Sequence, residues 1–397
     1  MTNDGQPALT PKLRFPEFRD AEGWIQSQID DIAVSESSSL ALNKLSLRPT
    51  GYAVYGADSC VGFIDSYAQS EDYIAIVKDG SGVGRLSLKR GESSVLGTLA
   101  YIKCKPSSRT TLSWLFYCLN SIDFRKFVKG TGIPHIYFAD FATHKVLVPP
   151  SPEQQKIADC LTSVDDLIAA HVRKVNALKT HKKGLMQQLF PCEGETQPRL
   201  RFPEFQNAGE WGEAKLGNHV AIGSGNSPSN FTLSSTGKYA LVKVEDLNNC
   251  TKYQITGREF CDDSVGAVPM NSIVFPKRGA AIELNKIRIT AAEILIDTNL
   301  MALTPKNGLT TEFLYYCIAN VGLSHIADTS TIPQINNKHI IPFNFLLPTL
   351  PEQQRIADCL TSLDALIAAQ AHKLDTLKAH KKGLMQQLFP SPEEVEA

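Results

Sequence analysis

The sequence predicts an α+β fold in which two mixed α/β globular domains are separated by two long helices. The helices are expected to pair with each other as an intramolecular coiled coil within a pseudo-twofold repeat. Residues 152–191 recur at 351–390 with 30 of 40 positions identical. The apolar residues of both copies alternate in steps of four and three, which is the seam spacing of a coiled coil. The rest of the chain contains short strand-like runs and no long parallel βαβ pattern, which favours α+β.

A second repeat opens each half of the 397-residue chain. Residues 13–18 (LRFPEF) recur at 200–205, and Trp24 matches Trp211, at an offset of 187 rather than the 199 of the first repeat. The second half therefore carries about twelve extra residues in the part that differs. The order is A-B-A′-B′, in which the B segments are nearly constant and the A segments diverge.

Each constant segment is predicted to form one long helix. Ser151, Pro152 and Gln154 are typical of a capped helix N-terminus with a capping box, and Pro191 should end the helix. The predicted seams are Val164, Ile168, His171, Val175, Leu178, Lys182, Leu185 and Leu189, and Leu363, Ile367, Gln370, Leu374, Leu377, Lys381, Leu384 and Leu388.

Polar residues interrupt both seams at matching positions, which are His171, Lys182, Gln370 and Lys381. A polar seam residue lowers stability but penalises wrong registers, so we expect these four to set the register in which the two helices pair. The alternative is that each seam packs only on its own globular half.

The divergent segments contain runs with strand and helix character. Strand-like runs bounded by turn residues are Tyr73–Val77, Tyr101–Lys105, Tyr239–Val244 and Ser272–Phe275. The aromatic runs Trp114–Leu119 and Phe313–Ile318 lie at matching positions, and we expect both to be helical and to belong to the core.

These patterns divide the chain into five predicted segments. They are a first globular domain at 1–150, a central helix at 151–191, a second globular domain at 192–348, a C-terminal helix at 349–391 and an acidic tail at 392–397.

Composition limits the classes of function. The hydrophobic fraction of 43% and charged fraction of 20% are ordinary for a soluble globular protein. No apolar run approaches the roughly 20 residues that span a bilayer, so we expect a cytoplasmic chain with no membrane partner. The net charge of −1 argues against a uniformly basic nucleic-acid binder but not against local basic patches. The nine cysteines form no CxxC pair and are expected to be reduced, buried apolar residues.

No self-contained catalytic site is predicted. The segment Gly80–Arg85 (GSGVGR) lacks the GK[ST] of a P-loop and the pattern of a dinucleotide fold, so it predicts a tight turn between strands that brings backbone close to a large ligand. Pro149-Pro150 is not preceded by the Asn or Asp of an amino-methyltransferase pocket. We therefore expect no catalytic residue, no metal site and no cofactor in this chain.

The candidates for nucleic-acid binding are local. Basic side chains gather around the Gly80–Gly84 turn and around Gly279, where lysine or arginine can contact phosphates or read guanine, and polar side chains that suit base edges lie nearby. The predicted DNA-binding residues are Tyr55, Lys78, Ser81, Arg85, Lys89, Asn226, Lys243, Asn248, Lys277, Arg278, Asn285 and Lys286. The alternative for any one of them is a solvated surface charge or a turn residue.

Several motifs together resemble one known family. They are LRFPEF with a following Trp in each half, YAVYG at 52–56, IVKDGSGVG at 76–84, FPKRGA at 275–280, TNLMA at 298–302, and the helix entries PPSPEQQKIADCL and LPTLPEQQRIADCL. Over nearly its whole length the chain resembles the specificity (S) subunits of type I restriction-modification systems.

This resemblance implies two target-recognition domains, at about 12–150 and 200–348, that each read one half of a bipartite, asymmetric DNA sequence. It also implies that the helices at 151–191 and 350–390 pair antiparallel as a spacer and dock two methyltransferase (M) subunits. Endonuclease/translocase (R) subunits would complete the complex. S-adenosylmethionine, ATP and Mg²⁺ would belong to these partners, and the M subunit would flip the adenine that it methylates.

Two other classes of function compete with this interpretation. A helical-rod scaffold that joins two proteins without a DNA role predicts no salt-dependent affinity for DNA. A stand-alone enzyme with an unrecognised site predicts turnover by the purified chain alone.

Overall fold

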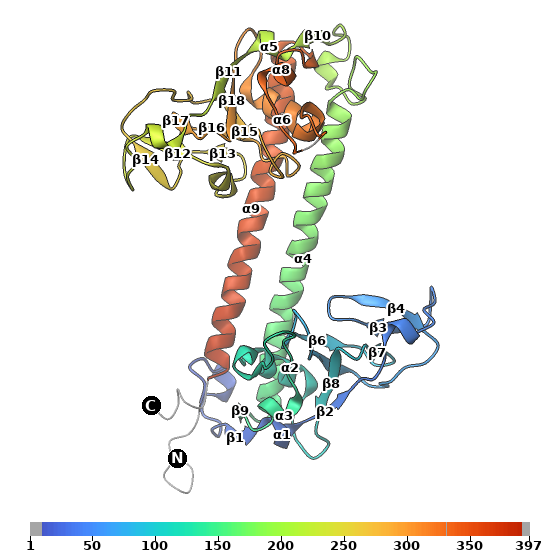
Figure 1. The fold of residues 1–397 in the computed structure, drawn as a ribbon. Helices are drawn as coiled ribbons and strands as arrows, with labels where there is room; N and C mark the ends of the chain where they lie inside the picture. Colours follow the sequence, from blue (N-terminus) through green and yellow to red (C-terminus); the bar gives the residue numbers. More distant parts are fainter. Residues whose placement is uncertain (1–9, 331, 391–397) are drawn as a thin grey trace. The chain divides into compact units, whose positions relative to one another are not determined.

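The chain folds as two units, and each contains one globular domain and one half of each long helix. The computed structural model describes residues 10–330 and 332–390. One unit runs to Val172 and includes the chain from His372 onward, and the other runs from Arg173 to Ala371. The long helices are α4 (Ser151–Leu189) and α9 (Leu350–Leu388), green and orange-red in Figure 1. The tail predicted at 392–397 lies outside the described residues, and the predicted domain boundaries stay a prediction.

The first unit contains three small sheets. Strand β1 pairs antiparallel with β9, a four-stranded sheet has the order β2-β8-β5-β6, and a three-stranded sheet has the order β4-β3-β7. The strands are β1 (Ile25–Gln28), β2 (Ala33–Ser37), β3 (Tyr52–Tyr55), β4 (Cys60–Ile64), β5 (Tyr73–Val77), β6 (Leu86–Lys89), β7 (Ser94–Val95), β8 (Leu99–Cys104) and β9 (Lys145–Val148). The short helices are α1 (Ile29–Ile32), α2 (Leu112–Asn120), α3 (Phe138–Phe141) and the 3-10 helices η1 (Pro16–Phe18), η2 (Leu42–Lys44) and η3 (Phe124–Phe127).

The second unit repeats this plan with one more strand. Strand β10 pairs with β19, a five-stranded sheet has the order β11-β18-β15-β16-β13, and a three-stranded sheet has the order β14-β12-β17. The strands are β10 (Gly212–Lys215), β11 (Val220–Ser224), β12 (Tyr239–Val242), β13 (Tyr253–Gln254), β14 (Glu259–Cys261), β15 (Ile273–Pro276), β16 (Arg288–Thr290), β17 (Ile294–Ile296), β18 (Leu300–Pro305) and β19 (Asn344–Leu347). The short helices are α5 (Leu216–His219), α6 (Thr311–Val321), α7 (Leu323–Ile326), α8 (Asn337–Ile340) and the 3-10 helices η4 (Pro203–Phe205), η5 (Pro228–Asn230) and η6 (Val244–Asn248).

The extra residues of the second half lie between β12 and β14. Val242 and Glu259, which end β12 and begin β14, are 17 positions apart, whereas Tyr55 and Cys60, which end β3 and begin β4, are five apart. The difference equals the twelve positions by which the two repeat offsets differ. The inserted segment contains η6 and β13, and β13 is the fifth strand of the larger sheet.

Strand β5 shows why a continuous apolar run forms a central strand. Ile74 and Ile76 face the core that contains α2, whereas Tyr73, Ala75 and Val77 face a second buried cluster with β8. Alternate side chains of a strand point to opposite faces, so a strand covered on both faces is apolar throughout. The strands predicted at 73–77, 101–105, 239–244 and 272–275 form as β5, β8, β12 and β15, and the helices predicted at 114–119 and 313–318 form as α2 and α6. Strand β12 ends earlier than predicted, because Val244 begins η6.

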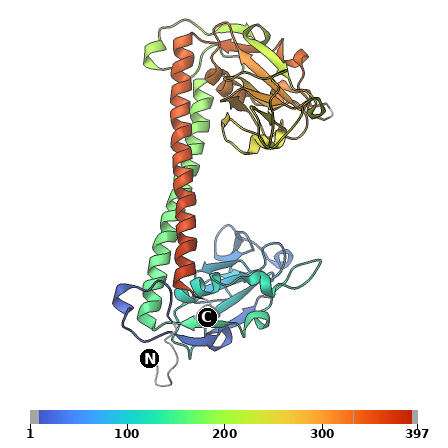
Figure 2. The same ribbon diagram turned by 90° about the vertical axis from the view of Figure 1, so that its left-hand side faces the viewer.

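Each globular core receives residues from both long helices. In the first unit the start of α4 (Ile157 and Leu161) and the end of α9 (Leu388) share one buried cluster with α2. In the second unit Leu189 ends α4 in the cluster that contains Leu360 of α9. The start of one helix therefore meets the end of the other in each unit, which is antiparallel pairing, and Figures 1 and 2 show these helix parts side by side within each unit.

The burial of the long helices follows the predicted seams. None of the sixteen predicted seam residues is exposed. Leu167 and Leu366, which lie off the seams, are 45% and 43% exposed. The alternative that each seam packs only on its own globular half is wrong, because Leu189 of α4 lies in the core of the second half and Leu388 of α9 lies in the core of the first.

The predicted helix cap is wrong. Ser151 is the first residue of α4, and its hydroxyl donates to the carbonyl oxygen of Arg109 (2.9 Å). The Gln154 side chain donates to the carbonyl oxygen of Pro149 (2.8 Å) and accepts from the N–H of Thr111 (2.9 Å). The Ser151 and Gln154 side chains form hydrogen bonds with the globular domain instead of capping the helix, because the domain packs directly on the start of α4. In the described part of the chain, no helix has both the length and the apolar character needed to cross a bilayer.

Candidate nucleic-acid interface

The predicted glycine-rich turn is confirmed between the antiparallel strands β5 and β6. Gly80 and Gly84 have φ angles of 91° and 84°, a left-handed region that glycine adopts readily. The N–H of Gly84 donates to the carbonyl oxygen of Val77 at 2.8 Å. A Cβ atom at Gly84 would lie 2.8 Å from the Cβ of Phe124, so a side chain there would displace η3.

The second half builds a matching turn between β15 and β16. Gly279 has φ 78°, and its N–H donates to the carbonyl oxygen of Pro333 at 2.9 Å. In the first half the N–H of Gly80 donates to Pro134 at the same distance. The backbone of the two turns is therefore anchored alike, although their side chains differ.

The basic residues of the first turn already have partners within the chain. Lys78 lies 3.5 Å from Asp79, and Arg85 pairs with Asp58 at 2.7 Å. The ammonium group of Lys89 lies over the Tyr55 ring, 4.2 Å from its centroid, and burial lowers the pKa of this lysine. The structure thus brings Tyr55 and Lys89 together, and it places Ser81, exposed, on the same turn as Lys78 and Arg85.

The basic residues of the second turn are not neutralised in this way. Within the described ranges, neither Lys277 nor Arg278 forms an ion pair or a side-chain hydrogen bond. Burial lowers the pKa of Lys277, the neighbouring Arg278 charge lowers it further, and the Asp297 carboxylate acts in the opposite direction. Arg278 is exposed, and Lys286 lies half-buried near the end of the turn. Asp79 of the first turn corresponds to Arg278 at the repeat offset of 199, so a charge reversal separates the two turns.

The remaining predicted DNA-binding residues are dispersed. Asn285 has φ 49°, and its side chain donates to Ala319 (3.1 Å) and accepts from the N–H of Leu323 (3.0 Å), so it has an internal role. Lys243 pairs with Glu259 at the edge of the inserted segment. Asn248 is exposed on η6, and Asn226 lies half-buried after β11. DNA contact by all of these residues stays a prediction.

A polar joint fastens each globular domain to both long helices. In the first half the Tyr117 hydroxyl of α2 donates to Asp165 of α4 at 2.9 Å, and Lys381 of α9 donates to the same carboxylate at 2.6 Å. In the second half Tyr316 of α6 donates to Asp364 of α9 at 2.7 Å, and Lys182 of α4 donates to it at 2.5 Å.

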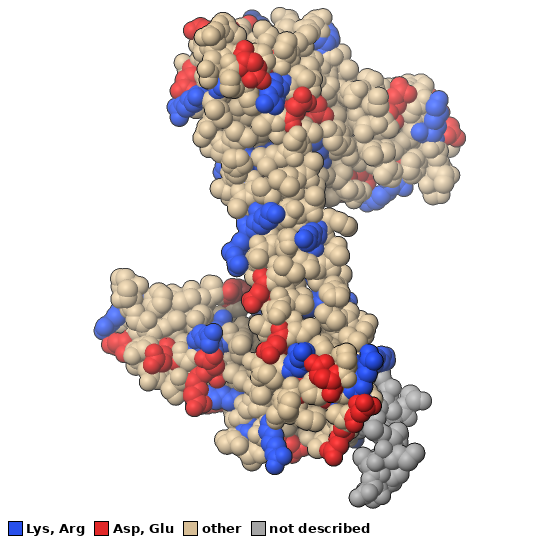
Figure 3. All heavy atoms as spheres, turned by 180° about the vertical axis from the view of Figure 1, so that it is seen from behind, with Lys and Arg blue, Asp and Glu red and all other residues tan. Residues whose placement is uncertain are grey.

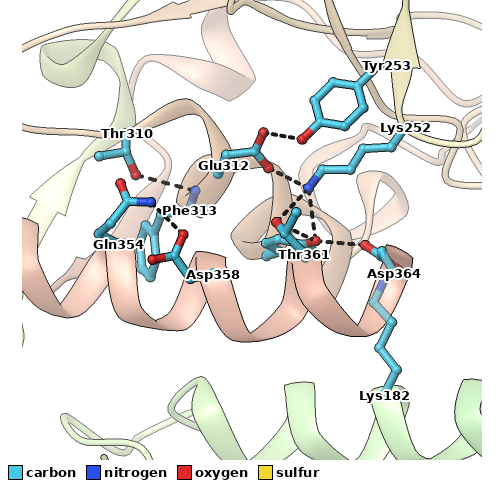
Figure 4. Close-up of polar contacts among 11 residues, drawn as sticks. Lys182, Lys252, Tyr253, Thr310, Glu312, Phe313, Gln354, Asp358, Thr361 and Asp364 are labelled. Atoms are coloured by element: carbon cyan, nitrogen blue, oxygen red, sulfur yellow. Dashed lines mark hydrogen bonds and ion pairs between the residues drawn. The ribbon is translucent and has the colours of Figure 1, made fainter. Parts of the chain in front are cut away.

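The second joint is drawn in Figure 4. Burial raises the pKa of both tyrosines, so their hydroxyls remain donors. Lys182 and Lys381 thus form cross-helix ion pairs at the seam. His171 Nδ1 and Gln370 Oε1, at the other two predicted register positions, are buried without a hydrogen-bond partner among the described residues.

The PEQQ segments anchor the start of each half. Arg14 lies 2.8 Å from Glu153, and Arg201 lies 2.7 Å from Glu352, with both carboxylates 1% exposed. The carboxylate of Glu153 raises the pKa of Arg14 by accepting its hydrogen bonds. The glutamine that follows is used alike in both halves, since Gln353 accepts from Thr310 as Gln154 accepts from Thr111.

Sequence reasoning missed both the polar joints and the buried Arg–Glu pairs. The signal was present, because Tyr117, Asp165 and Glu153 recur in the second half at the offset of 199.

Two matching grooves lie beside the ends of the long helices. The groove of the second unit has a volume of about 1040 Å³, and that of the first about 540 Å³. They share matching lining residues, which include Trp24, Cys118, Leu147 and Pro390 in one and Trp211, Cys317, Leu346 and Pro191 in the other. No group of three potential metal ligands gathers within residues 10–330 or 332–390. On the face drawn in Figure 3, basic and acidic side chains are interspersed.

A family comparison decides what these paired domains are. The family described as the type I restriction modification DNA specificity domain matches residues 21–180 and again residues 208–379. The chain belongs to this family. Its two matches coincide with the two halves of the repeat, and the function of the family is DNA sequence specificity rather than catalysis.

Curated relatives are also specificity subunits. The type I restriction enzyme MjaVIII specificity subunit of Methanocaldococcus jannaschii is 26% identical over 338 residues, which cover 81% of this chain and 79% of the relative. The type I restriction enzyme EcoR124I/EcoR124II specificity subunit of Escherichia coli is 21% identical over 276 residues, which cover 65% of each chain.

Solved structures share the fold of this specificity subunit. The S subunit of a type I restriction-modification system from M. genitalium superposes with a TM-score of 0.64 at 18% identity, over 96% of this chain and 99% of that one. A chain from a study of complex assembly and conformational transition of the type I system gives a TM-score of 0.57 at 16% identity, over 92% and 97% of the two chains. The predicted fold class of two mixed domains with long paired helices is confirmed.

Proposed function

We propose that this specificity subunit reads a bipartite, asymmetric DNA sequence, with one half-site contacted by each globular domain. The observation that carries the proposal is the contrast within the repeat. The joints to the helices are built from the same residues in both halves, whereas the turns that present basic side chains differ in sequence and charge. Two different surfaces held by matching tyrosine–aspartate–lysine joints suit a target with two different half-sites.

Two copies of a methyltransferase subunit bind to this chain in the proposed assembly. The near-identical helices repeat one surface, and the grooves at their ends share lining residues although they differ in volume, which suits two copies of one partner. Endonuclease/translocase subunits join the full complex. S-adenosylmethionine, ATP and Mg²⁺ bind to those partners and not to this chain, and the methyltransferase subunit flips the target adenine out of the duplex.

Reconstitution tests the division of labour. The purified chain should neither methylate nor cleave DNA, and addition of its methyltransferase subunit should give methylation that requires S-adenosylmethionine. Mapping of methylated adenines in a genome that carries the system should then show two half-sites separated by a fixed spacer. Methyl transfer by the chain alone, or methylation without sequence preference by the complex, would contradict the proposal.

The long helices set the spacer between the half-sites in this proposal. Asp165 and Lys182 of α4 are 17 positions apart, as are Asp364 and Lys381 of α9, so insertions between them leave both joints intact. One heptad inserted after Leu178 and another after Leu377 keep the seam in phase. Seven residues add about 10 Å at 1.5 Å per residue.

DNA rises about 3.4 Å per base pair, so methylation mapping of the double-insertion variant should show a spacer longer by up to about three base pairs. Rotation of one half-site around the duplex reduces this shift, but the half-site sequences should not change. Insertion in α4 alone is the control, because it takes Lys182 out of register with Asp364 and should abolish activity. Altered half-sites with an unaltered spacer would contradict the proposal that the long helices set the spacer.

A further inference from the structure

The two joints differ by one buried lysine. Lys252, which is 6% exposed, donates to the hydroxyls of Tyr316 and Thr361, each at 2.9 Å, and lies 2.5 Å from Glu312. Figure 4 shows it pointing from the inserted segment toward α6 and α9. Its ammonium group also lies 4.5 Å from the centroid of the Tyr316 ring. All four contacts link a residue just before β13 to the joint between the domain and the long helices.

The first half has the same joint without this lysine. The Tyr117 hydroxyl lies 3.2 Å from Thr162, as Tyr316 lies 3.2 Å from Thr361. Lys252 belongs to the twelve-residue insertion and has no counterpart there, and Glu312 corresponds to Ser113 at the offset of 199. The lysine and its acidic partner therefore occur together, in the half that has the extra strand.

The partners of Lys252 compensate for its burial. A buried ammonium group is costly unless it is paired and hydrogen-bonded. Here a carboxylate, two hydroxyls and an aromatic face surround it, and Tyr253 donates to the second oxygen of Glu312 at 2.8 Å. Asp364 also accepts hydrogen bonds from Tyr316 and Lys182. The inserted strand, α6, α9 and α4 are therefore joined through one continuous polar network.

This network ends in the sheet that carries the second basic turn. The carbonyl oxygen of Lys252 accepts from the N–H of Ile289 on β16 at 2.8 Å, and β16 follows directly after the turn with Lys277 and Arg278. A side chain that holds β13 to α9 therefore holds that turn at a set position on the helix.

We infer that Lys252 is a positioning residue that sets how the second recognition domain sits on the spacer helices, and hence the spacer length that the complex accepts. This rests on the proposed function. The first domain has no counterpart of this lysine.

The test uses the assembled complex with its methyltransferase subunits. Methylation rates are measured for the Lys252→Met variant on duplexes with the mapped spacer and with spacers longer or shorter by one base pair. Further duplexes carry one mismatch in either half-site. Lys306→Met, an exposed lysine of the same domain outside the network, is the matched control.

Lys252→Met should lower the preference for the mapped spacer by about tenfold, because misplacement by about 1 Å can cost up to about a hundredfold in rate. Discrimination against a mismatch in the first half-site should stay as in the wild type, and Lys306→Met should change none of the ratios. A domain that is only destabilised loses rate on all spacers alike. Unchanged spacer ratios in Lys252→Met would therefore overturn the inference.

A second variant keeps the test decisive if Lys252→Met does not fold. Glu312→Gln retains the size of the side chain but removes the charge that pairs with Lys252, and it should relax the spacer preference in the same direction with a smaller amplitude. An unchanged preference in this variant would also overturn the inference. Failure of the proposed function is a separate result, because the wild-type complex would then methylate without regard to spacer or half-site.

Discussion

The two halves agree closely at the base of each globular domain, where the domain contacts the start of a long helix, and they differ at the glycine-containing turns around Gly80 and Gly279. At the base, Arg14 and Glu153 are 2.8 Å apart and Arg201 and Glu352 are 2.7 Å apart. At the turn, the first half pairs Arg85 with Asp58, whereas Arg278 of the second half has no ion-pair partner in the described ranges. Residues that are repeated hold the domain onto the helices, and residues that diverge give the two turns different charges.

The largest expected effect comes from breaking the buried ion pairs at the base. Glu352→Ala leaves Arg201 buried without its partner and should cost roughly 3 to 5 kcal/mol of unfolding free energy, and Glu153→Ala should act similarly on Arg14. Glu352 also accepts from the indole N–H of Trp211 (3.2 Å), whereas Trp24 Nε1 has no partner in the described part of the chain. The second substitution should therefore be the milder one.

Urea unfolding of both variants checks this order. Glu17→Ala and Glu204→Ala are matched controls, because these glutamates form exposed pairs with Lys156 and Arg355 and should change the midpoint little. Equal losses of unfolding free energy for the buried and the exposed substitutions would contradict the prediction that the buried Arg–Glu pairs stabilise each domain more than the exposed pairs do.

An intermediate effect is expected at the turns. Lys277→Ala/Arg278→Ala should weaken binding to the second half-site, by roughly 1 to 3 kcal/mol for a base contact or with a salt slope lower by about one unit for each phosphate contact. Arg85→Ala/Lys89→Ala should have less effect, because Asp58 and the Tyr55 ring already engage these side chains.

Titration of DNA binding by the assembled complex, at several salt concentrations and with mismatches in either half-site, measures both pairs. If the second-turn pair leaves affinity, salt slope and sequence preference unchanged, Lys277 and Arg278 do not contact DNA.

The smallest expected effect tests whether the helix caps of α2 and α6 contribute equally to the stability of the two halves. Thr111 and Thr310 cap α2 and α6, and each hydroxyl accepts from a backbone N–H at 3.4 Å. Substitution of either by alanine should cost about 1 kcal/mol, equally in both halves. Thermal unfolding of the two variants side by side measures it. A clear difference between them would mean that the shared joints do not support the two domains alike.

Much of the fold follows from local sequence, whereas the candidate site does not. The seam of α4, the strand Tyr73–Val77 and the turn at Gly80–Gly84 are confirmed, since each depends on periodicity or on glycine within a few residues. The predicted capping role of Gln154 is wrong because its partner, Thr111, lies 43 positions away. Contact of the basic residues with DNA stays a prediction.

The sequence by itself determined the repeat, the long helices, four of the short strands, the presence of about twelve extra residues in the second half and the resemblance to specificity subunits. Internal identity and apolar period are properties of the chain alone. Only the tertiary structure decided that Arg85 forms an ion pair whereas Arg278 forms none with any described residue, and that Lys252 is buried against α6 and α9. The physical reason is that the partner of a charged side chain comes from whichever segment the fold brings near, here Tyr316 and Thr361 at 64 and 109 positions from Lys252.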